Sequence, residues 1–187
     1  MAELKLFMLM VGCRPKGRNT EQHDVLFGVG ETIRDLIPQI KSFWPGSEAI
    51  HVDAWREVNY VDGFKVSVLP KEEVNGQTDE QEALFFLNLG GYKAGEFDEF
   101  HYKLLVVART TAEATSKAKQ TAFYKHTSAK GAPSHIDDKF GVDVDDLYQV
   151  KDILLPEIKQ QYRLQLSPAT ITTEDELHLG YFQLHTL

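Results

Sequence analysis

The stretch LFMLMVGCRPKGRNTEQHDVLFGVGET, residues 6–32, occurs a second time in outline as LFFLNLGGYKAGEFDEFHYKLLVVART, residues 84–110. Placing Leu6 on Leu84 aligns the two stretches without a gap. A match of this length within one chain predicts a duplicated unit. The identical pairs include Gly12 and Gly90, Gly17 and Gly95, Glu21 and Glu99, His23 and His101, Val29 and Val107, and Thr32 and Thr110.

The match resumes after a longer connection, where His51-Val52-Asp53 aligns with His135-Ile136-Asp137. We therefore predict an α+β fold with two tandem ββαββ-type repeats packed with pseudo-twofold symmetry, plus a C-terminal β extension. The expected domains are a first repeat over 1–70, a polar linker over 71–82, a second repeat over 83–156, and an extension packed on the repeats over 157–187.

Each repeat begins with a continuous apolar run, Leu6–Val11 or Leu84–Leu89, which predicts a strand covered on both faces. A glycine-bounded loop and an alternating second strand follow. A helix comes next, capped by Thr32 or Thr110, and Pro38 should kink or interrupt the first helix because proline lacks a backbone donor. The predicted closing hairpins pair Ile50–Val58 with Phe64–Leu69, and His135–Val142 with Leu147–Leu154.

The bulk composition excludes several classes of partner. The 187 residues carry a net charge of −8, which argues against binding to nucleic acid or to an anionic membrane surface. No apolar run approaches the roughly 18 residues that span a bilayer. The single cysteine, Cys13, excludes an intramolecular disulfide and fits a reducing compartment, so we expect a cytoplasmic protein.

The pattern G-x4-G-x3-E-x-H, followed by a threonine-capped helix and then by H-[VI]-D, occurs in both halves of the chain. In this order the motifs resemble the bacterial family described as domain of unknown function 1543, whose members carry one or two copies of such a unit. The resemblance covers residues 4–156 and implies a small bacterial cytosolic protein. It carries over no catalytic residues, because the family has no assigned activity.

The polar residues that both halves retain are the candidate site. Glu-x-His and His-x-Asp on strands place both side chains of each pair on one face, about 6.5–7 Å apart. Imidazole and carboxylate groups are ligands for zinc, manganese or iron, so one interpretation of these residues is a divalent-metal site, although the sequence does not identify a cofactor. A metal-free site would instead use a carboxylate to orient a histidine as general base. The candidate residues are Glu21, His23, His51 and Asp53 in the first half, and Glu99, His101, His135 and Asp137 in the second.

Two further interpretations stay open for these residues. The His–acid pairs can satisfy each other and fix strand register, or they can bind a ligand without chemistry. The sequence thus favours a non-catalytic binding or interaction module, with a homodimer among its partners. The alternative is a metal-dependent hydrolase or acid–base enzyme.

The loop from Gly12 to Gly17 is interpreted as a turn that needs glycine, because its partner loop keeps the glycines and loses most of the cations.

Overall fold

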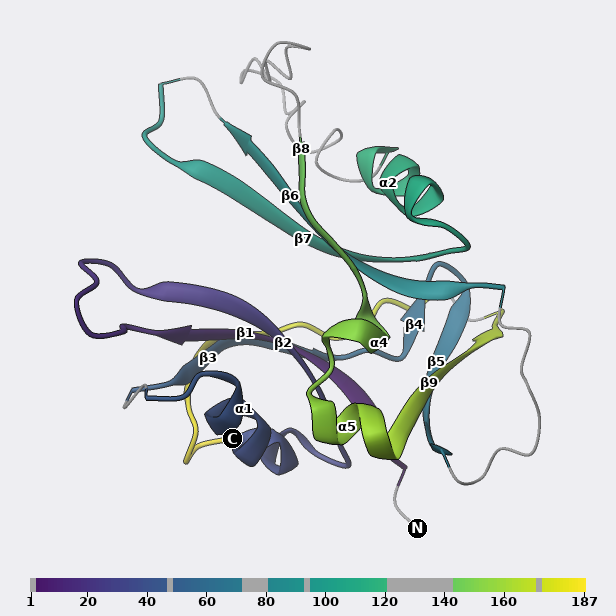
Figure 1. Cartoon of the computed structure of the whole chain (residues 1–187), viewed down its shortest axis with the longest axis horizontal. Coiled ribbons are helices and arrows are strands. Elements are labelled where there is room, and N and C mark those ends of the chain that lie inside the picture. Colours follow the sequence, from purple (N-terminus) through teal and green to yellow (C-terminus); the bar gives the residue numbers. More distant parts are fainter. Residues whose placement is uncertain (1–2, 47–48, 72–80, 93–94, 121–142, 171–172) are drawn as a thin grey trace. The chain divides into compact units, whose positions relative to one another are not determined.

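The computed structural model describes residues 3–46, 49–71, 81–92, 95–120, 143–170 and 173–187 (Figure 1). The chain forms two compact units, one from Met1–Asp79 together with Lys151–Leu187 and the other from Glu80–Val150. Strands dominate both units and helices are short, so the predicted α+β class is confirmed.

The first unit contains a four-stranded antiparallel sheet with the order β10-β3-β1-β2. Leu6–Val11 was expected as a strand, and it is the middle of β1. The register places Gly12 of β1 opposite His23 of β2 on one side and opposite His51 of β3 on the other. The strands are β1 (Lys5–Cys13), β2 (Gln22–Gly30), β3 (His51–Glu57) and β10 (His178–Gln183).

The segment after β2 is helical and covers one face of this sheet. It consists of a 3₁₀ turn, η1 (Ile33–Leu36), and α1 (Ile37–Phe43), whose first turn contains Pro38. Pro38 therefore interrupts the helix, as predicted, at a position where its missing donor is tolerated. Leu36 and Ile40 reach the apolar core formed by the strands.

The N-terminal cap of η1 is polar. The backbone N–H and the hydroxyl of Thr32 both donate to the carboxylate of Asp35, at 2.8 and 2.9 Å. These hydrogen bonds hold the pKa of Asp35 below its ordinary value. The predicted threonine cap of the first helix is thus confirmed.

A side-chain amide secures α1 to the edge strand β2. Gln39 Nε2 donates to the Val29 carbonyl at 2.7 Å, and the Val29 N–H donates to Gln39 Oε1 at 3.2 Å. In the second unit Lys117 Nζ donates to the Val107 carbonyl at 2.6 Å. Both contacts satisfy backbone groups that an edge strand leaves unpaired.

A second sheet of the first unit has the order β4-β5-β9, and its strands are β4 (Tyr60–Val61), β5 (Phe64–Pro70) and β9 (Tyr162–Pro168). The predicted hairpin of Ile50–Val58 with Phe64–Leu69 is wrong, because β3 pairs with β1 and β10 while β5 pairs with β4 and β9. A tight turn at Asp62 and Gly63, both with positive φ, gives β5 a nearer partner in β4.

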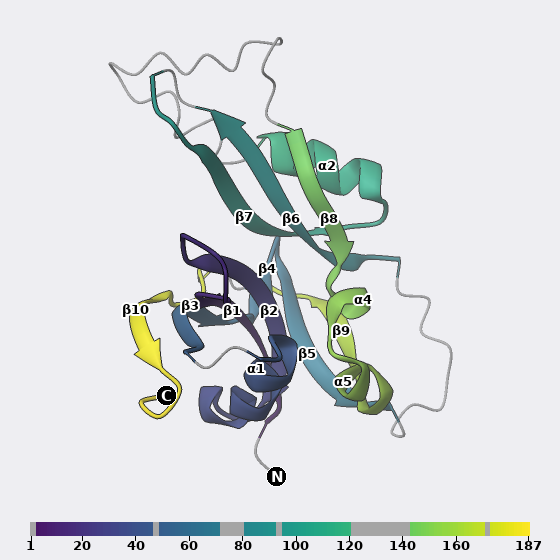
Figure 2. The ribbon, with the colours of Figure 1, turned by 60° about the vertical axis from the view of Figure 1, so that its left-hand side comes forward.

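The second unit contains a three-stranded antiparallel sheet with the order β7-β6-β8. Its elements are β6 (Ala83–Tyr92), β7 (Glu99–Ala108), α2 (Thr111–Gln120) and β8 (Asp143–Gln149). Figure 2 shows α2 along one face of this sheet, where Ala114 and Ala118 enter the core. The Arg109 N–H donates to Glu113 and lowers the pKa of that carboxyl.

The predicted second hairpin needs correction where the structure describes it. His135–Val142 lies outside the described residues. Leu147–Leu154 is not one strand, since β8 ends at Gln149 and a short helix, α4 (Val150–Ile153), follows. Val150 and Leu154 are both buried at the i, i+4 spacing of a helix face. A second helix, α5 (Pro156–Gln161), leads into β9.

None of the helices in the described part of the chain has the length and apolar character needed to cross a membrane.

Candidate metal centre

Three neighbouring strands bring the first group of polar side chains together. The pairing of Gly12 with both His23 and His51 places one histidine on each side of the central strand. Glu21 directly precedes β2 and lies two residues before His23. The site therefore forms where β1 ends and the connection to β2 returns.

A β-bulge is centred on Asp53, the fourth polar residue of this group. The pairing of β1 with β3 runs from Val11 opposite Val52 to Met10 opposite Ala54, so Asp53 is an extra residue without a partner on β1. A bulge changes which side chains share a face. As a result Val52 and Trp55, three residues apart, both pack with the helix-covered core. Asp53 keeps the side of His51, as the spacing of two residues along a strand gives.

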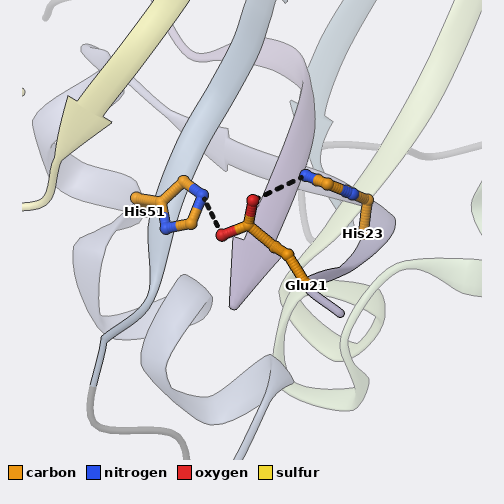
Figure 3. Close-up of side chains that lie close together, drawn as sticks. All are labelled: Glu21, His23 and His51. Atoms are coloured by element: carbon orange, nitrogen blue, oxygen red, sulfur yellow. Dashed lines mark ion pairs between the residues drawn. The ribbon is translucent and has the colours of Figure 1, made fainter. Parts of the chain in front are cut away.

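The carboxylate of Glu21 lies between the two imidazole rings (Figure 3). Glu21 Oε1 is 3.1 Å from His51 Nε2, and Glu21 Oε2 is 3.6 Å from His23 Nε2. One ligand atom from each of the three residues lies within 4.8 Å of the others. Neighbouring ligands of a tetrahedral zinc ion are about 3.3 Å apart, given metal–ligand distances of about 2.0–2.1 Å. The distances between these ligand atoms are close enough to that spacing for the three residues to bind one ion.

Asp53 contacts both histidines from the other side. Its Oδ2 is 3.1 Å from His23 Nε2, and its Oδ1 is 3.3 Å from His51 Nε2. The three-residue group whose ligand atoms converge consists of Glu21, His23 and His51. Asp53 thus lies beside that group as an additional carboxylate.

Two buried polar atoms of the cluster lack hydrogen bonds. The side chain of His51 is 3% exposed, and its Nε2 has no hydrogen-bond partner although two carboxylate oxygens lie near it. Asp53 Oδ2 is buried and equally unbonded. Carboxylate oxygens lie close to His51 Nε2 but are not aligned with it for a hydrogen bond. The two buried atoms therefore point toward a shared space and not at each other. A cation in that space would satisfy His51 Nε2 and would lie beside Asp53 Oδ2.

The other nitrogen of His51 fixes which atom can act as ligand. His51 Nδ1 lies 3.4 Å from the Ala49 carbonyl oxygen, so a proton on Nδ1 is donated to the backbone. That tautomer presents the lone pair of Nε2 to the cluster. A backbone partner of this kind is the usual support of a metal-binding histidine.

Gly12 leaves the space that the cluster needs. A Cβ at this position would lie 2.5 Å from His51 Nε2 and 2.6 Å from Asp53 Oδ2. Any side chain would therefore displace the two buried atoms. The glycine shared by both repeats at this position is required by the site.

The second unit builds a related but more exposed cluster. Gly90 of β6 lies opposite His101 of β7 and opposite Asp143 of β8, and Asp145 is the extra residue of a bulge. His101 Nδ1 is 3.2 Å from Asp145 Oδ2, and Glu99 completes the group. All three side chains are about one-third exposed or more, and none of their atoms is buried without a hydrogen bond.

The structure brings together Glu21, His23, His51 and Asp53 in the first unit, and Glu99 and His101 in the second. His135 and Asp137 lie outside the described residues. The sequence interpretation missed Asp145, which has the register position of Asp53. The pattern x-Val-Asp in Asp143-Val144-Asp145 could have revealed it, since it repeats His51-Val52-Asp53 without the histidine.

The family model described as Domain of Unknown Function (DUF1543) matches residues 18–68. The matched segment includes Glu21, His23, His51 and Asp53, and it supports the predicted family resemblance over that part of the chain. No curated protein matches the chain. The crystal structure of a protein Il1583 from Idiomarina loihiensis is similar, with a TM-score of 0.62 over 97% of this chain and 98% of that chain, at 24% identity. Similarity at this identity shows a shared fold.

The substitution Gly12→Ala tests the crowding at the site. We expect it to lower the free energy of unfolding by about 1–3 kcal/mol, because the new Cβ meets buried atoms that cannot move away. In the matched substitution Gly90→Ala the three atoms nearest the new Cβ all belong to the carboxylate group of Asp145, a side chain that is 31% exposed and can rotate into water, and none belongs to a buried ring such as that of His51. Urea unfolding followed by circular dichroism measures both, and equal losses would contradict the close approach of His51 to β1.

Proposed function

We propose that this chain binds a divalent transition-metal ion through Glu21, His23 and His51, and that its primary role is that of a metal-binding module. The observation that carries the proposal is the buried Nε2 of His51, which faces two carboxylate oxygens without a hydrogen bond. A buried polar atom left unbonded costs about 1–3 kcal/mol, and coordination removes that cost.

The donor set selects the class of ion. Two imidazoles and one carboxylate are the ligands of His₂Glu zinc sites and of the two-histidine, one-carboxylate iron sites. Magnesium and calcium prefer all-oxygen ligands, so they fit this set less well. Among zinc, iron and manganese, zinc binds nitrogen and oxygen ligands most tightly, which makes it the preferred probe.

The interpretation of the pairs as purely structural has less support. Side chains that serve only to fix strand register would align their donors and acceptors with each other. Here four nitrogen–oxygen distances lie between 3.1 and 3.6 Å, yet His51 Nε2 remains unbonded. Mutual satisfaction therefore does not account for the geometry.

A metal-dependent hydrolase is the second candidate. Glu21 and His23 are 41% and 43% exposed, so one side of the cluster is open to solvent and substrate. A bound ion would act there as a Lewis acid. Asp53 Oδ2, buried and unbonded beside His23, is the group that would accept a proton from an attacking water.

We further propose that the two units are tandem copies of one ββαββ-type ancestor, related by a pseudo-twofold axis, in a bacterial cytosolic protein. In each unit the first strand lies between the second and the third, and this shared strand order supports the duplication. The glycine that both units have on the first strand, and the β-bulge beside it in the pairing with the third strand, support it too. The contrast between the units supports a division of roles, with the metal bound by the first.

Elemental analysis of protein purified without a polyhistidine tag tests the metal site. We expect about one equivalent of zinc per chain after zinc loading and desalting, because three converging ligands close on one ion. His51→Ala should lose the ion, whereas the matched substitution His101→Ala in the second unit should retain it. Wild-type protein that remains folded and metal-free after loading would contradict the proposal.

The hydrolase candidate is tested by Asp53→Asn in zinc-loaded protein. We expect this variant to keep its metal, because Asp53 lies outside the converging group, and to lose at least about 100-fold in hydrolysis of p-nitrophenyl esters and phosphates. His101→Ala serves as the control with unchanged turnover. Zinc-loaded wild type that hydrolyses none of these compounds leaves the binding module as the function.

A further inference from the structure

The C-terminal strand β10 adjoins the metal-binding strand β3 on the side opposite β1. Its register runs from Leu179 opposite Ala54 to Phe182 opposite Val52. Gly180 and Tyr181 therefore lie opposite the single residue Asp53. The strand pairing is thus irregular on both sides of β3 at the position of Asp53, which is next to the site.

The irregularity in β10 depends on a glycine. Gly180 has a φ of +148°, in a region that side-chain-bearing residues rarely adopt. The residue after it, Tyr181, has its ring against the imidazole of His51, with ring centroids 4.3 Å apart and an interplanar angle of 32°. A bulge that re-aims a side chain beside a functional site is a recurrent device in sheets.

Three contacts then define the orientation of the His51 ring. The Ala49 carbonyl holds Nδ1, Gly12 gives Nε2 its space, and Tyr181 packs against the ring. Tyr181 itself is 63% exposed, so its burial contributes little to the core. Its ring contact with His51 is the specific interaction that the structure records for it in the described part of the chain.

Tyr181 also forms part of the wall of an open cavity of about 540 Å³. Ile37 and Lys41 of α1 and Ile50 beside His51 contribute to the same wall. Removal of the tyrosine ring is therefore expected to extend this cavity to the imidazole. Water at that face would weaken the restraint on the ring and raise the local dielectric constant.

We propose that Tyr181 is a positioning residue for the metal ligand His51, so that the C-terminal strand completes the metal centre. The inference rests on the proposed function. The ring of Tyr181 holds the imidazole in the plane that directs Nε2 toward Glu21. Groups that orient a metal ligand without touching the ion typically contribute about 10–100-fold to metal affinity.

Zinc affinity measured by competition with a chromophoric chelator tests this role. Tyr181→Ala should weaken zinc binding about tenfold or more, and Tyr181→Phe should match the wild type because the ring remains. Leu179→Ala is the matched control, since Leu179 is 72% exposed on the same strand and no ring contact depends on it. Tyr181→Leu, which keeps apolar bulk without a planar ring, provides a second variant if the alanine variant misfolds.

Nitrogen NMR of the imidazoles in metal-free protein provides a readout that does not depend on the ion. Wild type and Tyr181→Phe should show His51 as a single tautomer with the proton on Nδ1, and Tyr181→Ala should show exchange between tautomers. Unchanged affinity together with an unchanged tautomer in Tyr181→Ala would overturn the inference and leave the proposed function intact. Absence of zinc binding in the wild type would instead defeat the proposed function, and the tautomer comparison would still decide the role of Tyr181.

Discussion

The site depends on one steric constraint in the central strand of the first sheet. Residue 12 is crowded for any side chain, because a Cβ there would meet His51 Nε2 and Asp53 Oδ2 of the neighbouring strand β3. Asp53, two residues after His51 and at a one-residue bulge, adds a carboxylate from the same side. The pairing of β2 and β3 with the central strand β1 thus brings together two pairs of polar side chains from segments about 30 residues apart, Glu21 with His23 and His51 with Asp53. The remaining architecture, including the helix-covered core on the opposite face, holds these strands in register.

The energetic balance distinguishes the two clusters. In the first unit a nearly buried imidazole keeps an unbonded nitrogen, at a cost of about 1–3 kcal/mol in metal-free protein. A structural zinc ion contributes about 10–16 kcal/mol in zinc-finger peptides, which is enough to offset such a cost several times over. In the second unit Glu99, His101 and Asp145 are about one-third exposed or more and have no buried unbonded atom, so no comparable cost calls for an ion. One position separates the two clusters: His51, which is 3% exposed, has the register position of Asp143 in the second unit, whereas the other three side chains have similar exposures in both.

Much of the first site could be predicted from sequence, because Glu-x-His and His-x-Asp keep their same-face relation once they lie in strands. Strand partners could not be predicted, since apolar periodicity identifies a strand but not its neighbour. The tight turn at Asp62 and Gly63 gave β5 the partner β4, which left β3 to pair with β1 and β10. Asp145 was missed because the His-x-Asp motif was matched to His135-Ile136-Asp137, while Asp143-Val144-Asp145, which lacks the histidine, has the register position of His51-Val52-Asp53. Tyr181 carried no sequence signal, as its role arises from a bulge beside a strand more than a hundred positions earlier.

X-ray absorption spectroscopy at the zinc edge, on zinc-loaded protein without a polyhistidine tag, tests the central claim most directly. The account predicts a first shell with two imidazole nitrogens at about 2.0–2.1 Å and carboxylate oxygen at about 2.0–2.2 Å. The multiple-scattering signal should correspond to two imidazole rings in the wild type and to one ring in His23→Ala. A shell of oxygen atoms alone, or one that contains sulfur from Cys13, would contradict the account.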